Sequence, residues 1–348
     1  PLHVFSGGFQ EATHYDETRY ARLVADHIGA HYHQVFPTVD DFIDLLPHLV
    51  YIMDEPAAGP GLFPQYMVSK LAREHVKVVL GGQGGDEIFG GYTRYLVAYL
   101  EEVLHGSIEG TQADAEYVAT FETLLPNLGQ LRGYRPMLQY FWREGLFEAQ
   151  DARYFRLINR SESIQGYVQQ EVLHGRAGYS PYEAYRAVFN ADPQCASYIN
   201  RMIRFDTLTL LPALLHVEDR TSMAVSLESR VPLLDHRIIE LMASVPPTIK
   251  YKGGQSKYLF RRAIQHIVPE AIFKRSDKMG FPVPLNEWYA QPQLRSFITD
   301  TMLSTAARQR GIFQPEALET VLSQAPQYDR GLWGALSLEL WFQTFIDA

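Results

Sequence analysis

The sequence is poor in cysteine, in positive charge and in long apolar runs, and each shortage excludes a class of protein. A single cysteine, Cys195, rules out an intrachain disulfide framework and favours a reducing cytoplasm; with no histidine nearby in sequence, it is predicted to be a buried, inert thiol. The 31 Lys and Arg residues against 40 Asp and Glu give a formal net charge of −9, which argues against electrostatic binding of nucleic acid or a membrane surface. No apolar run is long enough to span a membrane, and the first residues do not resemble a signal peptide.

What is present indicates a globular protein with a large core. The 348 residues are 46% hydrophobic, which allows one large domain or two smaller ones. Residues 1–95 alternate short strands with amphipathic helices, a pattern that predicts an α/β fold with a parallel sheet and flanking helices. Residues 96–348 are predicted to be mostly helical, and no linker or repeat separates them from the first part. Strands are expected at 2–5, 31–36 and 76–80, and helices at 16–28, 39–53 and 64–75.

The most informative segment is VVLGGQGGDEIFGGY, from Val78 to Tyr92. Its six glycines follow a β-branched strand, and glycine both accepts positive φ and lets the backbone approach a ligand. Because open α/β sheets bind ligands beyond the carboxyl ends of their strands, we expect backbone N–H groups here to hold an anion. Asp86 is placed to hold the cation that accompanies a phosphate. The alternative is a tight turn whose acidic residue caps the next helix.

A second turn of small residues, Ser6-Gly7-Gly8, also lies between a predicted strand and a helix. It is either a phosphate-binding loop of the SGGxDS kind or a strand end that leaves room for a flat base. The following residues are Phe9, Gln10 and Glu11, without the Asp and hydroxyl that a pyrophosphate loop needs. We therefore favour the strand end.

Two lysines are candidate phosphate ligands. Lys257 follows Gly253-Gly254 at the start of a predicted helix, where a cation opposes the helix dipole unless an anion lies between them. Lys278 lies in a basic loop next to Phe281 and Trp288, and an exposed turn anchored by these aromatics explains that loop equally well.

Residues 214–236 alternate apolar and charged side chains too closely for a solvated helix face, so these charges must pair or bind something. Asp219 and Arg220 are equally suited to either role. The irregular loop after Asp54-Glu55-Pro56 is open to a functional or a purely structural interpretation. Ion pairs between packed helices are the favoured interpretation for Glu228, Arg230 and Asp235.

Four segments, in this order, resemble the synthetase domain of glutamine-dependent asparagine synthetases: LGGQGGDEIFGGY, EDRTSMAVSLESRVPLLDH, GGQSKYLFRRA and RSDKMGFPVPLNEW. The segment FSGGFQEATHYDETRYARLVADHIGAHYHQV is similar to the stretch after that family's pyrophosphate loop. The resemblance covers nearly all of residues 1–348 and implies an adenine-nucleotide α-hydrolase-like ATP-pyrophosphatase fold. It also implies that the first strand, the SGGxDS loop and the N-terminal glutaminase domain are absent here, so we expect a chain cut from a longer protein and inactive alone.

The resemblance implies an amide ligation that uses ATP and Mg²⁺. A carboxylate, such as that of aspartate, attacks the α-phosphate and expels pyrophosphate, and ammonia from the glutaminase domain then attacks the acyl-adenylate. Asp86 matches the family's metal ligand, Lys257 matches the lysine that balances charge during adenylation, and Gln83 occupies a catalytic position. The resemblance allows a homodimer. Nucleotide binding is expected from Gly7, Gly81, Gly82, Gly84 and Lys278, and substrate binding from Asp219 and Arg220.

Two positions depart from the family pattern. Gln83 stands where asparagine-forming relatives have Glu, and an amide cannot act as a base near neutral pH. Either another carboxylate or water takes the proton, or the nucleophile differs. His216 stands near a point where some relatives have Arg.

Three hypotheses therefore stay open. The chain is an asparagine-forming synthetase domain, a related cyclase that closes a β-lactam or macrolactam, or a non-catalytic module that binds a nucleotide or a partner. An upstream SGGxDS loop would reject the last, and an N-terminal glutaminase would favour the first over the second.

Overall fold

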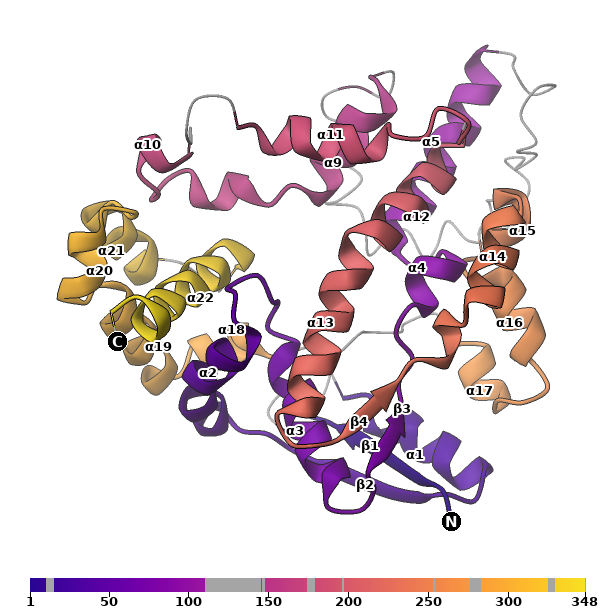
Figure 1. Ribbon diagram of the computed structural model, residues 1–348, viewed down its shortest axis with the longest axis horizontal. Coiled ribbons are helices and arrows are strands. Elements are labelled where there is room, and N and C mark those ends of the chain that lie inside the picture. Colours follow the sequence, from indigo (N-terminus) through magenta and orange to yellow (C-terminus); the bar gives the residue numbers. More distant parts are fainter. Residues whose placement is uncertain are drawn as a thin grey trace.

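The computed structural model of the chain describes residues 1–10, 16–109, 145, 148–173, 179–195, 197–252, 255–275, 283–324 and 329–347. The strands and the N-terminus lie at one end of the molecule, and helices make up most of the rest (Figure 1). Within these residues, no helix combines the length and apolar character needed to cross a membrane.

The N-terminal part alternates strands and helices as the hydrophobic pattern predicts. Thr38 and Asp41 form a reciprocal capping box that fixes the start of the second helix, and Asp54 ends that helix with a left-handed φ of 62°. The elements are β1 (His3–Gly7), α1 (Thr18–His27), β2 (His31–Val35), α2 (Val39–Met53), α3 (Leu62–Arg73), β3 (Val78–Leu80) and α4 (Gly85–Phe89).

The strands are parallel, but in the described residues they form two pairs. β1 pairs with β2, from His3 opposite His31 to Gly7 opposite Val35. β3 pairs with β4 (Glu228–Arg230), which the sequence analysis had placed among packed helices. This arrangement is compatible with the predicted α/β fold. The sequence analysis expected one parallel sheet, and the described residues form two small parallel sheets instead. α3 packs on β1 and β2 and also on the long helix of residues 210–223.

Apart from β4, the described residues after α4 are mostly helical, as predicted. Its elements are α5 (Thr93–Glu109), α9 (Gln150–Ile158), η5 (Ser161–Ile164), α10 (Gln170–Leu173), α11 (Pro181–Phe189), α12 (Tyr198–Leu208), α13 (Leu210–Met223), η6 (Pro232–Leu234), α14 (His236–Ser244), α15 (Pro247–Lys250), α16 (Tyr258–Ile264), α17 (Glu270–Phe273), α18 (Leu285–Tyr289), α19 (Pro292–Met302), α20 (Thr305–Arg310), α21 (Pro315–Gln324) and α22 (Arg330–Phe345).

The largest core joins the two ends of the sequence. Phe42 of α2 and Phe63 of α3 pack around the fully buried Trp288 of α18, together with Leu336 of α22. Fully burying one such side chain stabilises the fold by roughly 1.5–3 kcal/mol. Residues of the first 95 and of the last 70 or so thus share one core, so α2 and α3 cannot be placed without the C-terminal helices.

Candidate functional site

The glycine loop begins where β3 ends. The amide of Gly81 donates to the carbonyl of Arg230 at 2.8 Å and so continues the strand pairing into the loop. Gly82 is exposed, and a Cβ built on it would meet nothing within 4 Å. In the part of the chain that the structure describes, the amides of Gly82, Gln83 and Gly84 donate no hydrogen bond. Of these three backbone donors, that of Gly82 lies on an exposed residue, that of Gln83 on a partly buried residue and that of Gly84 on a buried one.

Several glycines of the loop are required by packing. Gly84 has φ of +85°, and a Cβ there would overlap Leu234 of η6. Gly90 has φ of +72°, and its carbonyl accepts a hydrogen bond from the buried Tyr251 hydroxyl. A Cβ on Gly91 would collide with the side chains of Asp86 and Lys257. Among the glycines of this loop, Gly82 is the one where no described residue would contact a side chain, so packing does not explain why it is glycine.

Asp86 and Lys257 lie together although 170 positions separate them in sequence. Lys257 Nζ is 2.6 Å from Asp86 Oδ1, and the two side chains are 18% and 28% exposed. Asp86 lies in the first turn of α4, and Lys257 directly precedes α16 with a left-handed φ of 53°. A non-glycine residue in this conformation is strained by about 1–3 kcal/mol, which the surrounding structure must offset. The pair therefore places a carboxylate and an ammonium at the end of the glycine loop, where Lys257 Nζ lies 4.0 Å from the position of a Cβ built on Gly85.

Gln83 binds a carboxylate that the sequence analysis did not single out. Its Nε2 donates to Glu218 Oε2 at 3.2 Å, and Gln65 of α3 donates to the same oxygen. The other oxygen, Oε1, accepts from Ser229 Oγ of β4 at 2.5 Å. Glu218 thus joins α13, α3, β4 and the glycine loop.

A helical signal for Glu218 exists in the sequence. On α13, position 218 shares a face with Leu211, Thr221 and Ser222, all of which are buried, so spacing of three, four and seven residues marks 218 as inward-facing. Asp219 and Arg220 attract notice first because they are adjacent and opposite in charge.

Asp219 and Arg220 face elsewhere. Arg220 lies roughly 200° around the helix from Glu218. Its guanidinium is 2.6 Å from Asp54 Oδ2 at the end of α2, in a pair that is half exposed, and Asp219 is exposed. Their substrate-binding role stays a prediction.

The other charged residues of this segment pair locally. Arg230 contacts Glu228 within β4 at 2.7 Å, and Arg237 contacts Asp235 at the start of α14, also at 2.7 Å. The prediction of ion pairs between packed helices was therefore wrong in its location: a short exposed strand and a helix cap hold these pairs.

The remaining candidates fall into four groups. Gly7 ends β1, where a Cβ would lie 3.1 Å from Val68 of α3, so its small size has a packing reason and its nucleotide role stays a prediction. Cys195 is half-buried, and burial raises the pKa of its thiol, as an inert cysteine requires. The imidazole of His216 contacts the Met53 carbonyl at 3.1 Å. Lys278 and the pair Gly253-Gly254 lie outside the described residues.

The chain belongs to the asparagine synthase family, whose model matches residues 1–343. It is 29% identical over 353 residues to asparagine synthetase [glutamine-hydrolyzing] 1 of Bacillus subtilis (strain 168), covering 99% of this chain and 52% of that protein. A putative asparagine synthetase [glutamine-hydrolyzing] of Mycobacterium tuberculosis is 30% identical over 359 residues, covering 99% of this chain and 51% of that protein. The chain thus spans about half the length of these curated relatives.

A shorter match with a higher percentage identity is to putative asparagine synthetase [glutamine-hydrolyzing] 2 of Methanocaldococcus jannaschii. It is 44% identical over 98 residues, which cover 28% of this chain and 19% of that protein.

Proposed function

We propose that this chain is the synthetase part of an ATP-dependent amide ligase that adenylates the side-chain carboxylate of aspartate and transfers ammonia from glutamine to it. Membership of the asparagine synthase family supports amide ligation in general, and the relatives are named as glutamine-hydrolysing asparagine synthetases. The observation that carries the proposal is the pairing of Lys257 with Asp86 beside the glycine loop.

The residues fit a nucleotide and its magnesium ion. A carboxylate such as that of Asp86 is a hard oxygen ligand of the kind that Mg²⁺ takes, and the Gly82 to Gly84 amides are suited to phosphate oxygens. Bound Mg²⁺ would neutralise negative charge on the departing pyrophosphate. Lys257, released from Asp86 when a cation takes its place, would then place its charge on the phosphates.

Adenylation joins the substrate carboxylate oxygen to the α-phosphorus, and the bond from that phosphorus to pyrophosphate breaks. In the second step the amine nitrogen bonds to the acyl carbon, AMP leaves, and one N–H proton must be accepted. Gln83 cannot accept it. Glu218, hydrogen-bonded to Gln83 at 3.2 Å, is the carboxylate that we assign to this task, with Gln83 and Gln65 orienting it.

The test is product analysis with the full-length protein, ATP, Mg²⁺ and a panel of carboxylates, with and without glutamine. We expect aspartate-dependent release of pyrophosphate, with AMP and asparagine formed when glutamine or ammonium is present. Formation of AMP and a cyclic amide from another carboxylate that carries its own amine, with no ammonia consumed, would instead identify a cyclase. No release with aspartate would overturn the proposal.

A further inference from the structure

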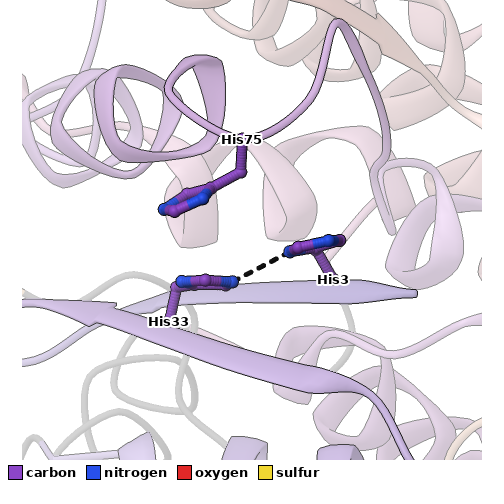
Figure 2. A group of neighbouring side chains, drawn as sticks. All are labelled: His3, His33 and His75. Atoms are coloured by element: carbon purple, nitrogen blue, oxygen red, sulfur yellow. Dashed lines mark hydrogen bonds between the residues drawn. The ribbon is translucent and has the colours of Figure 1, made fainter. Parts of the chain in front are cut away.

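Three histidines from separate segments meet at the other end of the strands from the glycine loop. His3 is the first residue of β1, His33 lies in β2, and His75 follows α3 shortly before β3 (Figure 2). Gly7, by contrast, is the last residue of β1, and Gly81 directly follows β3. The cluster is therefore separate from the residues assigned to ligation.

The three imidazoles converge closely. One nitrogen from each ring lies within 4.8 Å of one from each of the others, and His3 Nδ1 is 2.9 Å from His33 Nε2 (Figure 2). The rings of His33 and His75 have centroids 3.9 Å apart. Strand register explains part of this: His3 pairs with His31 and Phe5 with His33, so all four rings lie on one face of the β1–β2 pair.

We propose that His3, His33 and His75 form a binding site for a late first-row divalent transition-metal ion of the Zn²⁺ class. Neutral imidazole is a preferred ligand of Zn²⁺, Cu²⁺ and Ni²⁺, whereas Mg²⁺ selects oxygen ligands, so this site is chemically distinct from Asp86. Three histidines with a fourth position left to water is a recurrent Zn²⁺ arrangement.

The geometry needs only local adjustment. Ligand nitrogens of a tetrahedral zinc ion with bonds of about 2.0–2.1 Å lie about 3.4 Å apart. The histidine nitrogens span 2.9 Å to at most 4.8 Å. The rings of His3 and His33 are stacked with 14° between their planes, and His75 stacks on His3 at 21°, so the rings must turn to point their nitrogens at one ion. A bound ion would tie β1, β2 and the approach to β3 together.

The experiment uses the chelator-treated full-length protein without nucleotide, in excess Mg²⁺ to occupy carboxylate sites. Zn²⁺ is titrated in competition with a chromophoric chelator, and Co²⁺ absorption reports tetrahedral nitrogen ligation. We expect one tightly bound Zn²⁺ per chain, a Zn²⁺-dependent rise in unfolding temperature, and visible Co²⁺ bands. Loss of a residue that only orients a metal ligand typically weakens metal binding by roughly 10-fold to 100-fold. His75→Gln removes a ligand itself, so Zn²⁺ binding should weaken by at least that factor.

His31→Gln is the matched control, because its ring is 5.2 Å from that of His3 and it lies on the same strand as His33, outside the three-histidine group. His75 is exposed, so its replacement should leave the metal-free fold unchanged, which unfolding in chelator checks. Retained binding in His31→Gln with loss in His75→Gln supports the site. Absence of stoichiometric Zn²⁺ in the wild type, equal binding in His75→Gln, or equal loss in His31→Gln overturns it.

Discussion

The pairing of Lys257 with Asp86 explains why a lysine stands at a helix start in a strained left-handed conformation. The helix dipole and the backbone strain both disfavour this position, and the carboxylate 2.6 Å away offsets them. In the proposed function, a cation bound by Asp86 would release the charge of Lys257 to the phosphates of the nucleotide.

Lys257→Ala should therefore slow pyrophosphate release by roughly 100-fold to 1,000-fold, the usual loss when one group that stabilises transition-state charge is removed. The measurement is single-turnover pyrophosphate release by the full-length protein. Lys274→Ala is the control, because Lys274 forms an exposed pair with Glu270 one helical turn away. Equal rates for the wild type and Lys257→Ala would remove Lys257 from the site.

Glu218→Gln separates the two chemical steps. The substitution keeps the side-chain shape and some hydrogen bonding to Ser229 but removes the proton acceptor. We expect pyrophosphate release to fall little and amide formation to fall by roughly 100-fold or more, in line with loss of a general base. Measuring pyrophosphate and asparagine in a single turnover checks this, because after the first turnover an unreacted acyl-adenylate would also hold back pyrophosphate release. A proportional loss of both products would mean that Glu218 only supports the structure of the loop.

The glycines of the loop are of two kinds: those where a side chain would clash with neighbouring residues, and Gly82, where it would not. Gly91→Ala places a methyl group against Asp86 and Lys257 and should destabilise the protein by about 1–3 kcal/mol, with loss of activity. Gly82→Ala meets nothing within 4 Å and should leave the free energy of unfolding within about 0.5 kcal/mol of wild type.

Gly82→Ala should nevertheless raise the KM for ATP if this loop holds the phosphates, because a methyl group on its exposed backbone would keep a ligand from approaching closely. Gly59→Ala is the control, since it too is exposed with nothing within 4 Å of a built Cβ. Unfolding curves and ATP kinetics of the three variants are the measurements. An unchanged KM for Gly82→Ala would argue against nucleotide binding at this loop.

The boundaries of a helix or strand could be predicted from the sequence where nearby residues determine them. α2 was predicted at 39–53 and lies at Val39–Met53, because Thr38 and Asp41 form a capping box and its apolar spacing is regular. β4 was missed because Glu228-Ser229-Arg230 carries no apolar pattern and is a strand only through its pairing with β3. Glu218 was missed for a related reason: its importance comes from Gln65, Gln83 and Ser229, which sequence spacing cannot bring together.

At the scale of the whole molecule, one buried lysine sets a pH dependence of stability. Lys250 is 3% exposed, donates to Asn200 Oδ1 at 3.1 Å, and burial lowers the pKa of its ammonium from 10.5 to about 8. Below pH 8 both folded and unfolded chains hold the proton, and the burial cost, about 3 kcal/mol from this pKa difference, is fully present. Between pH 8 and 10.5 the folded chain releases it first, so this contribution makes the protein more stable as pH rises.

Lys250→Met should consequently stabilise the protein at pH 7, and its advantage should shrink towards pH 10. Comparing the urea midpoints of both proteins at the two pH values cancels the titration of the tyrosines and other groups. If the urea midpoints of the wild type and Lys250→Met differ by the same amount at pH 7 and pH 10, the charge of Lys250 does not set this pH dependence.

The most direct test of adenylation at this site is the fate of oxygen. Full-length protein is given ATP, Mg²⁺, glutamine and aspartate labelled with ¹⁸O in its side-chain carboxylate, and the phosphate-containing products are analysed by mass. Attack on the α-phosphorus predicts one ¹⁸O in AMP and one ¹⁸O kept in the side-chain amide of asparagine. Pyrophosphate should be unlabelled and formed in the same amount as asparagine. Label in inorganic phosphate together with ADP, or no transfer of label from aspartate, would contradict the account.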